Sequence, residues 1–224
     1  MIEALILDLD DTLYDESTYV TSGLQAVARY MAGQYTANED ELFALMRADI
    51  AKNGRGSAFN AALRSIGVAD SEHVVSELLA VYREHQPSIE LYDDAKNLLQ
   101  GLRSTMPSLR LGLITDGLPI MQRQKVNALH LDQTFDFICY CWEHSAPKPS
   151  VKGFERLHSE LNVLPGQCVM VGDRVDHDLT PAKSLGMYTV RITRGRYTSQ
   201  SSPTQIVDLS LPSLEGVLDY LKTI

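Results

Sequence analysis

The sequence is poor in the features that build disulfide frameworks, zinc sites and membrane spans. Only three cysteines occur in 224 residues, too few for a set of stapling disulfides or a four-cysteine zinc site. Cys139 and Cys141 alternate within an apolar stretch, so we expect them to pack as small hydrophobic side chains. No apolar run approaches about 18 residues, and strand-like sequence begins next to Met1. We therefore expect no membrane span and no signal peptide, and hence a soluble cytoplasmic protein.

Positive charge is also scarce. Twenty Lys and Arg residues stand against 29 Asp and Glu residues, which gives a formal net charge of −9. A nucleic-acid partner requires a basic stripe to neutralise its phosphates, so this balance argues against one. It leaves room for a small anionic substrate, because a bound metal and a few placed cations decide the local field.

What the chain does contain is a regular alternation of strand-like and helix-like segments. Mostly continuous apolar runs, typical of strands covered on both faces, occur at 4–8, 109–114, 135–140, 167–172 and 187–192, with a weaker one at 205–209. Helical patterns separate them near 92–103, 119–129, 150–161, 177–185 and 213–222. This order predicts an α/β fold with a doubly wound, parallel, Rossmann-like sheet.

The interval after the first strand differs, since it has helical periodicity and no convincing strand. The helical patterns cover 20–31, 39–50, 57–66 and 74–82. We therefore predict a core domain of residues 1–15 and 89–224 and a small all-helical cap domain of residues 16–88 inserted after the first strand. Such a cap can exclude water and read the substrate.

Three carboxylates within four positions end the first strand, in the run Leu7-Asp8-Leu9-Asp10-Asp11. Burying so much like charge is costly unless a cation offsets it, which favours a hard divalent metal and an electron-poor substrate. One of the carboxylates of Asp8 and Asp10 is suited to nucleophilic attack and the other to proton transfer. The alternative is a turn or helix-cap cluster, for which Asp11-Thr12 is typical.

Two further segments place polar groups at strand ends. Thr115 precedes the turn Asp116-Gly117, and its hydroxyl with the backbone N–H groups beyond it suits a phosphoryl oxygen; a helix N-cap before Pro119 is the alternative. Lys148 lies between two prolines that stiffen the backbone, which suits a fixed ammonium. Taken alone, a solvated surface lysine is the simpler interpretation.

The fourth strand-like run ends in Gly172-Asp173, with more acidic residues close behind. Asp173 is placed to share a metal with the first carboxylates. Asp178 opens a helix, where it can orient ligands or a metal-bound water, and a plain N-cap role is compatible with both. We assign Asp176 to turn formation and His177 to the surface.

These segments occur in the order Asp-x-Asp, Thr, Lys and Gly-Asp-x-x-x-x-Asp, each at the carboxyl end of a predicted core strand or in the loop after it. In this pattern the chain resembles the haloacid dehalogenase-like hydrolase superfamily, in the branch with a helical cap after the first motif. The stretch from Glu143 to Phe154 is similar to that family's third motif region. The chain departs from the family at Asp116, where asparagine is more usual, at Trp142, where a small or acidic residue is common, and at Ser145, where glycine is frequent.

The resemblance implies a Mg²⁺-dependent phosphomonoesterase. Asp8 would attack phosphorus to form an aspartyl-phosphate, and Asp10 would protonate the departing oxygen and then deprotonate the hydrolytic water. Thr115 and Lys148 would hold the phosphoryl group, together with the turn Asp116-Gly117.

For the metal, the resemblance implies Mg²⁺ bound by the Asp8 carboxylate, the Asp10 backbone carbonyl and Asp173, with Asp178 as a fourth candidate. Asp10 argues against dehalogenation, because an alkyl halide needs no proton on its leaving group. A phosphomutase acting on a sugar phosphate remains open, as does a non-catalytic protein that binds a phosphorylated ligand. A phospho-acceptor receiver domain fits poorly, because it has another motif order and no helical insert.

Substrate choice is the least constrained part of the prediction. Lys52 and Arg55 lie in an apparent inter-helix turn of the cap, and we hypothesise that they contact the leaving group or a second anionic group of the substrate. Solvated surface charge is the alternative. Because the cap is small, we expect the partner to be a small phosphorylated metabolite, either a sugar phosphate or a nucleoside monophosphate.

Overall fold

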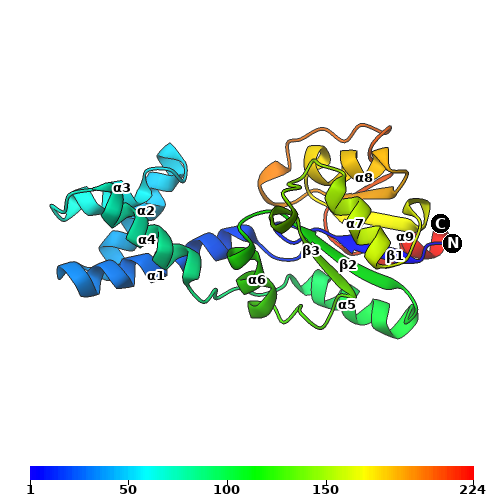
Figure 1. Ribbon diagram of the computed structural model, residues 1–224, viewed down its shortest axis with the longest axis horizontal. Coiled ribbons are helices and arrows are strands. Elements are labelled where there is room, and N and C mark those ends of the chain that lie inside the picture. The colour runs from blue at the N-terminus through cyan, green and yellow to red at the C-terminus, as the bar shows by residue number, and fades with distance from the viewer. The chain divides into compact units, whose positions relative to one another are not determined.

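The computed structural model describes all residues from 1 to 224, and they form two compact units (Figure 1). Met1–Glu16 and Glu90–Ile224 make up one unit, which we call the core unit. Ser17–Ile89 make up the other, which we call the insert.

The core unit is built on a six-stranded sheet with the strand order β3-β2-β1-β4-β5-β6. Its strands are β1 (Ala4–Leu7), β2 (Arg110–Thr115), β3 (Phe137–Tyr140), β4 (Cys168–Gly172), β5 (Tyr188–Ile192) and β6 (Leu209–Leu211). Every neighbouring pair is parallel, and every residue of the central strands β1 and β4 is buried. The predicted doubly wound parallel sheet is confirmed.

Helices follow the strands and cover both faces of this sheet. They are α5 (Asp93–Thr105), α6 (Pro119–Ala128), α7 (Lys152–Glu160), α8 (Thr180–Ser184) and α9 (Val217–Thr223). The chain adds strands outward from β1 in both directions, so right-handed crossovers place the helices on opposite faces. Ala4 and Ile6 of β1 pack in one cluster with Phe154 and Leu157 of α7. The intervening β1 side chains face the other way and are also fully buried, as continuous apolar strands require.

The last strand is the main error of the sequence prediction. The sequence predicts it at 205–209, whereas β6 is Leu209–Leu211. The Ile206 and Val207 amides both donate to the Pro203 carbonyl, which folds this stretch into a turn. Both apolar side chains still pack against the cluster beside α7, so burial alone did not require a strand.

Two predicted helices also differ in detail. The segment 177–185 is divided into a π-helical turn, Val175–Leu179, followed by α8. The last helix begins only at Val217, because Gly216 before it adopts a left-handed φ of 89°.

The insert consists of four helices, α1 (Glu16–Tyr35), α2 (Glu39–Asn53), α3 (Ala58–Ser65) and α4 (Glu72–Glu84). Helix α1 begins at Glu16, the last residue of the first segment of the core unit. The Asn38 and Ser71 side chains accept backbone N–H groups in the first turns of α2 and α4. The helices share their own buried core, which includes Val27, Met31, Met46, Leu63 and Leu78.

The chain leaves and re-enters the core unit at neighbouring points. Tyr14 and Leu91 are paired across an antiparallel bridge. Arg194, which follows β5, holds this crossing in place: its guanidinium lies 2.7 Å from an Asp94 carboxylate oxygen and donates to the Thr12 carbonyl.

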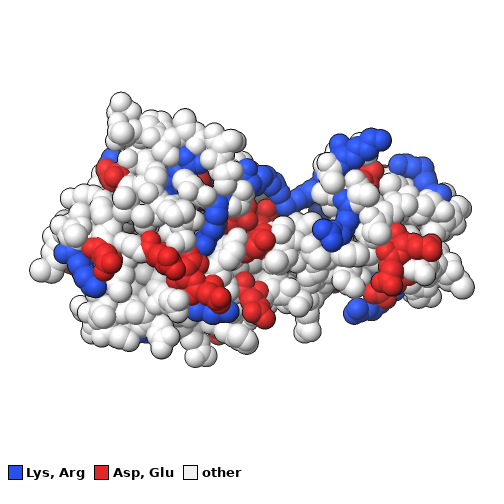
Figure 2. Space-filling view, turned by 180° about the vertical axis from the view of Figure 1, so that it is seen from behind, with Lys and Arg blue, Asp and Glu red and all other residues white.

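The surface shows no concentration of positive charge on the face seen in Figure 2, where Lys and Arg are interspersed with Asp and Glu in small groups. No helix in the structure combines the length and the hydrophobicity that a bilayer crossing requires.

Candidate active site

Four charged side chains from separate parts of the chain meet at the carboxyl edge of the sheet. Asp8 follows β1 and Asp173 follows β4, and these adjacent parallel strands end side by side. Asp178 lies in the π-helical turn, and Lys148 lies in the loop between β3 and α7. One carboxylate oxygen of each aspartate lies within 4.8 Å of the other two.

Lys148 joins two of these carboxylates. Its Nζ lies 2.6 Å from Asp8 Oδ1 and 2.6 Å from Asp178 Oδ1, and all three side chains are almost fully buried. Burial alone would lower the pKa of Lys148, but the two carboxylates raise it well above its ordinary value. The Lys148 backbone N–H donates to both oxygens of Asp116, which fixes the loop that carries the ammonium.

Gly172, the last residue of β4, is required because the Asp178 side chain packs against it. A Cβ on Gly172 would lie 2.5 Å from Asp178 Oδ2, so the Asp178 side chain fills the space that a larger residue would occupy. The same Oδ2 accepts the Arg174 backbone N–H at 3.0 Å. Asp178 thus folds back against the end of β4 and holds Lys148 from there.

The charges of this cluster fit a divalent cation. Three carboxylates face one ammonium, so two negative charges are uncompensated when all the acids are ionised. Burial, together with the neighbouring carboxylates, raises the pKa of Asp8 to about 7 and that of Asp173 to about 9. Asp173 Oδ2 is buried and has no hydrogen-bond partner. An all-oxygen donor set with an unpartnered carboxylate oxygen suits a hard ion such as Mg²⁺.

The Asp10 carboxylate is held apart from this cluster by other donors. Lys125 Nζ lies 2.7 Å from its Oδ1, Gln122 Nε2 lies 2.9 Å from its Oδ2, and the Tyr14 hydroxyl donates to Oδ1. Burial would raise the pKa of Asp10, but the Lys125 ammonium and these hydrogen bonds hold it below its ordinary value.

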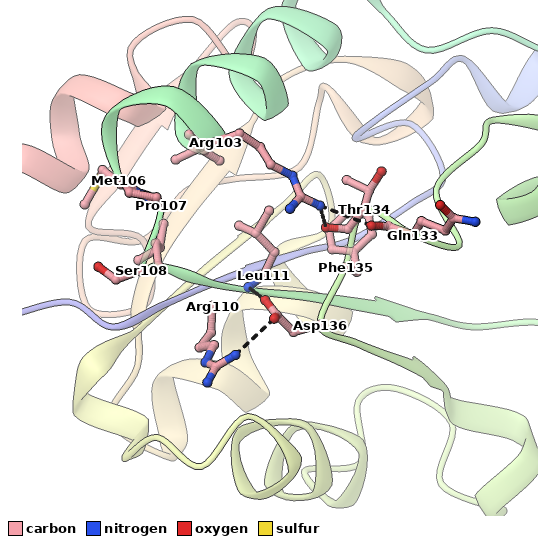
Figure 3. A pocket seen from close by; sticks show the side chains of 12 residues that line it. Arg103, Met106, Pro107, Ser108, Arg110, Leu111, Gln133, Thr134, Phe135 and Asp136 are labelled. Carbon is pink, nitrogen blue, oxygen red and sulfur yellow. Dashed lines mark hydrogen bonds and ion pairs between the residues drawn. The ribbon is translucent and has the colours of Figure 1, made fainter.

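The cavity that contains these groups is small and polar. Its volume is about 220 Å³, and Asp8, Asp10, Lys148 and Asp173 all line it. A larger cavity of about 520 Å³ lies where β2 begins, at the opposite edge of the sheet (Figure 3).

The polar groups of the larger cavity bind one another. Arg103 donates to the carbonyls of Gln133 and Thr134, and Arg110 lies 3.2 Å from Asp136 (Figure 3). The cluster of Asp8, Asp173 and Asp178 lies in the smaller cavity, which is therefore the candidate active site.

The chain matches a known protein family over most of its length. The model of the haloacid dehalogenase-like hydrolase family matches residues 2–186. The chain belongs to the haloacid dehalogenase-like hydrolase family. The predicted family relationship is therefore confirmed.

Relatives within the family are similar over nearly the whole chain. A glyceraldehyde 3-phosphate phosphatase of Methanocaldococcus jannaschii is 29% identical over 228 residues, which cover 100% of this chain and 99% of that protein. An N-acylneuraminate-9-phosphatase of Mus musculus is 28% identical and covers 97% of this chain and 95% of its own. A solved phosphatase of the family from Thermococcus onnurineus aligns with a TM-score of 0.64 at 26% identity, over 98% of both chains. These full-length matches identify the chain as a phosphatase of the family.

The turn after β2 contributes one of its three predicted site residues to the lining of the cavity. Asp116 lines the cavity, but Thr115 and Gly117 are not among its lining residues. Thr115 is buried, and its hydroxyl accepts a hydrogen bond from the Gln122 amide. Asp116, where the family more often has asparagine, uses its carboxylate to hold the Lys148 loop.

The other departures from the family pattern lie on the loop after β3. Ser145 has a φ of 50°, in the left-handed region where glycine costs least, which explains why glycine is frequent at this position. Trp142 is about half exposed. In the insert, Lys52 and Arg55 are both exposed.

Sequence reasoning missed the residues that surround Asp10 and those at the rim of the cavity. Gln122, Lys125 and Val126 form the buried side of α6, and a lysine in register with apolar neighbours was the available signal. At the rim, the Arg174 guanidinium stacks on Tyr197 at 4.4 Å from the ring centre, and both residues line the cavity. Arg174 follows Asp173 at the end of β4, whereas Tyr197 is brought there by the loop after β5, whose role no local pattern indicates.

Proposed function

We propose that this phosphatase hydrolyses phosphomonoesters of small metabolites through an aspartyl-phosphate formed on Asp8, with Mg²⁺ as cofactor. The observation that carries the proposal is the cluster of the Asp8, Asp173 and Asp178 carboxylates, two of which, Asp8 and Asp178, also bind the buried Lys148. The relatives' names support the substrate class, since glyceraldehyde 3-phosphate and an N-acylneuraminate 9-phosphate are small phosphorylated compounds. A polar cavity of about 220 Å³ has room for a phosphoryl group.

In the first step an Asp8 oxygen attacks phosphorus, and the bond from phosphorus to the ester oxygen breaks. Asp8 is held for this attack, because Lys148 donates to its Oδ1 and the Thr12 hydroxyl to its Oδ2. Asp10 is held ionised, so it first takes the proton of an incoming monoester monoanion and then passes it to the departing oxygen. The products are the free alcohol and phosphorylated Asp8.

In the second step a water molecule attacks the same phosphorus and the bond to Asp8 breaks. Asp10, again a carboxylate, removes a proton from that water, and inorganic phosphate leaves. Lys148 lies close enough to Asp8 to offset charge on the transferring group in both steps.

The residues present would hold Mg²⁺ through the carboxylates of Asp8 and Asp173 and the backbone carbonyl of Asp10. Asp178, whose two oxygens accept from Lys148 and from the Arg174 amide, would support the site by fixing the ammonium. When bound, the ion supplies positive charge that lets a carboxylate and a phosphoryl group approach each other.

Removal of the metal tests the proposal. Protein treated with EDTA should release phosphate from 4-nitrophenyl phosphate at least about 10²-fold more slowly, and added Mg²⁺ should restore the rate. Mg²⁺ should also raise the melting temperature of the wild type, because it neutralises the buried carboxylates.

The matched variants are Asp173→Asn, which should lose both responses to Mg²⁺, and Asp208→Asn, which should keep both. Asp208 is an aspartate outside the lining of the cavity, where it pairs with Lys183 at 2.6 Å. Full activity in EDTA would contradict the proposed metal dependence.

We further propose that the insert, predicted as a cap at 16–88, selects the substrate through Lys52 and Arg55. Arg55→Ala should raise the KM for the preferred metabolite by about tenfold, because a charge-assisted contact to an anionic group is lost, with kcat little changed. The rate on 4-nitrophenyl phosphate should stay the same.

A panel of sugar phosphates and nucleoside monophosphates, scored by phosphate release, provides this measurement. Arg47→Ala, which removes an exposed arginine on α2 rather than in the turn that follows it, is the control. Unchanged selectivity in Arg55→Ala would leave Arg55 as ordinary surface charge.

A further inference from the structure

Lys125 is a buried cation to which the steps above give no task. Its side chain is only 4% exposed, and it lies on the buried side of α6 with Gln122 and Val126. Burying an ammonium is costly unless a carboxylate compensates it, and here Asp10 Oδ1 does so at 2.7 Å.

The two buried lysines of the cavity serve different carboxylates. Lys148 contacts Asp8 and Asp178, whereas Lys125 contacts Asp10. Asp10 lies two residues after Asp8, so without its own cation it would be drawn toward the charge that compensates Asp8. The division keeps the attacking carboxylate and the proton-carrying carboxylate apart.

The contact is also geometrically fixed. Gln122, one turn before Lys125, donates through its amide both to Asp10 Oδ2 and to the Thr115 hydroxyl at the end of β2. The Tyr14 hydroxyl, four residues after Asp10 in the segment that follows β1, donates to Asp10 Oδ1. Two donors on α6, Lys125 and Gln122, and a third after β1, Tyr14, therefore fix the orientation of both Asp10 oxygens.

We propose that Lys125 is a positioning residue, which holds the Asp10 carboxylate where it can pass a proton to the departing oxygen and take one from water. The inference rests on the proposed function, because it assumes the proton-transfer role of Asp10. Lys125 exchanges no proton itself and does not bind the phosphoryl group.

Two substrates with different leaving groups can distinguish a positioning role of Lys125 from a role in supporting the fold. In single turnovers, Lys125→Met should slow alcohol release from glycerol 3-phosphate by about 10²-fold, because an alkoxide leaves poorly without a proton. Its nitrophenolate burst from 4-nitrophenyl phosphate should stay within about threefold of wild type, because that anion leaves unprotonated, and only the later hydrolysis should slow. Lys183→Met, which removes a lysine paired with Asp208, should change neither phase. Equal losses on both substrates would overturn the inference.

A double-mutant cycle gives an independent test. Asp10→Asn/Lys125→Met should be no slower than Asp10→Asn alone, because residues that act as one unit do not contribute twice. Multiplying losses would overturn the inference. The double variant removes both charges of the pair, so the comparison stands even if Lys125→Met alone folds poorly. If Asp10→Asn were as active as wild type, the proposed function itself would fail, whatever Lys125→Met showed.

Discussion

Replacing Asp8 with asparagine is expected to lower phosphate release by at least about 10⁴-fold, because the amide cannot form the covalent phosphoryl bond. The fold should remain intact. Asp8 is one of three clustered buried carboxylates, of which only Asp8 and Asp178 pair with Lys148, so its conversion to a neutral group relieves like-charge repulsion while keeping the shape of the side chain. Steady-state phosphate release and the melting temperature measure the two effects.

Trapping of the phosphorylated protein sharpens this test. Acid-quenched wild type should retain phosphate on the chain during turnover, and Asp8→Asn should retain none. Asp208→Asn, which alters an aspartate outside the cavity, should behave as wild type in both assays. Near-normal turnover by Asp8→Asn would refute the nucleophile assignment.

Replacing Lys148 with methionine is expected to have the next largest effect, and it should damage both catalysis and stability. We expect turnover to fall by about 10³-fold, because the fixed charge beside Asp8 is lost. The free energy of unfolding should fall by about 3–5 kcal/mol, because Asp8 and Asp178 lose their common buried partner. Denaturant unfolding measures the second effect.

Two comparisons identify the cause of that loss. Lys183→Met breaks an ion pair in which both side chains are about one quarter to one third exposed, so it should cost about 1 kcal/mol or less. Lys148→Met/Asp178→Asn should recover part of the stability of the single variant, because it removes one uncompensated carboxylate, but it should recover no activity. An unfolding free energy equal to wild type in Lys148→Met would contradict the buried pairing.

The sheet was predictable because its strands are continuous apolar runs, a local signal that tertiary context did not override. The parallel order followed from the intervening helices, and it explains why residues as distant in sequence as Asp8 and Asp173 end at one edge. Their proximity is therefore a consequence of topology, although their chemical roles stay predictions.

Features that depend on contacts between distant segments were not predictable in the same way. Nothing local in the sequence tells that Lys125 meets Asp10 or that Arg174 stacks on Tyr197. The weak strand signal at 205–209 failed for a related reason, since Ile206 and Val207 are buried from a turn and need no strand partners. Periodicity reports which side chains are buried, and it does not report what they touch.

The crossing between Tyr14 and Leu91 has a consequence for how such a chain can change over time. Tyr14 and Leu91, which flank the insert, are bridge partners. The insert therefore leaves and rejoins the core unit at one point, as the loop of a hairpin does, whatever its length. The insert could therefore be replaced by a longer, shorter or differently folded segment without moving any strand of the core sheet. The core unit can then stay constant while the insert varies, because the Arg194–Asp94 ion pair that fixes the junction belongs entirely to the core unit.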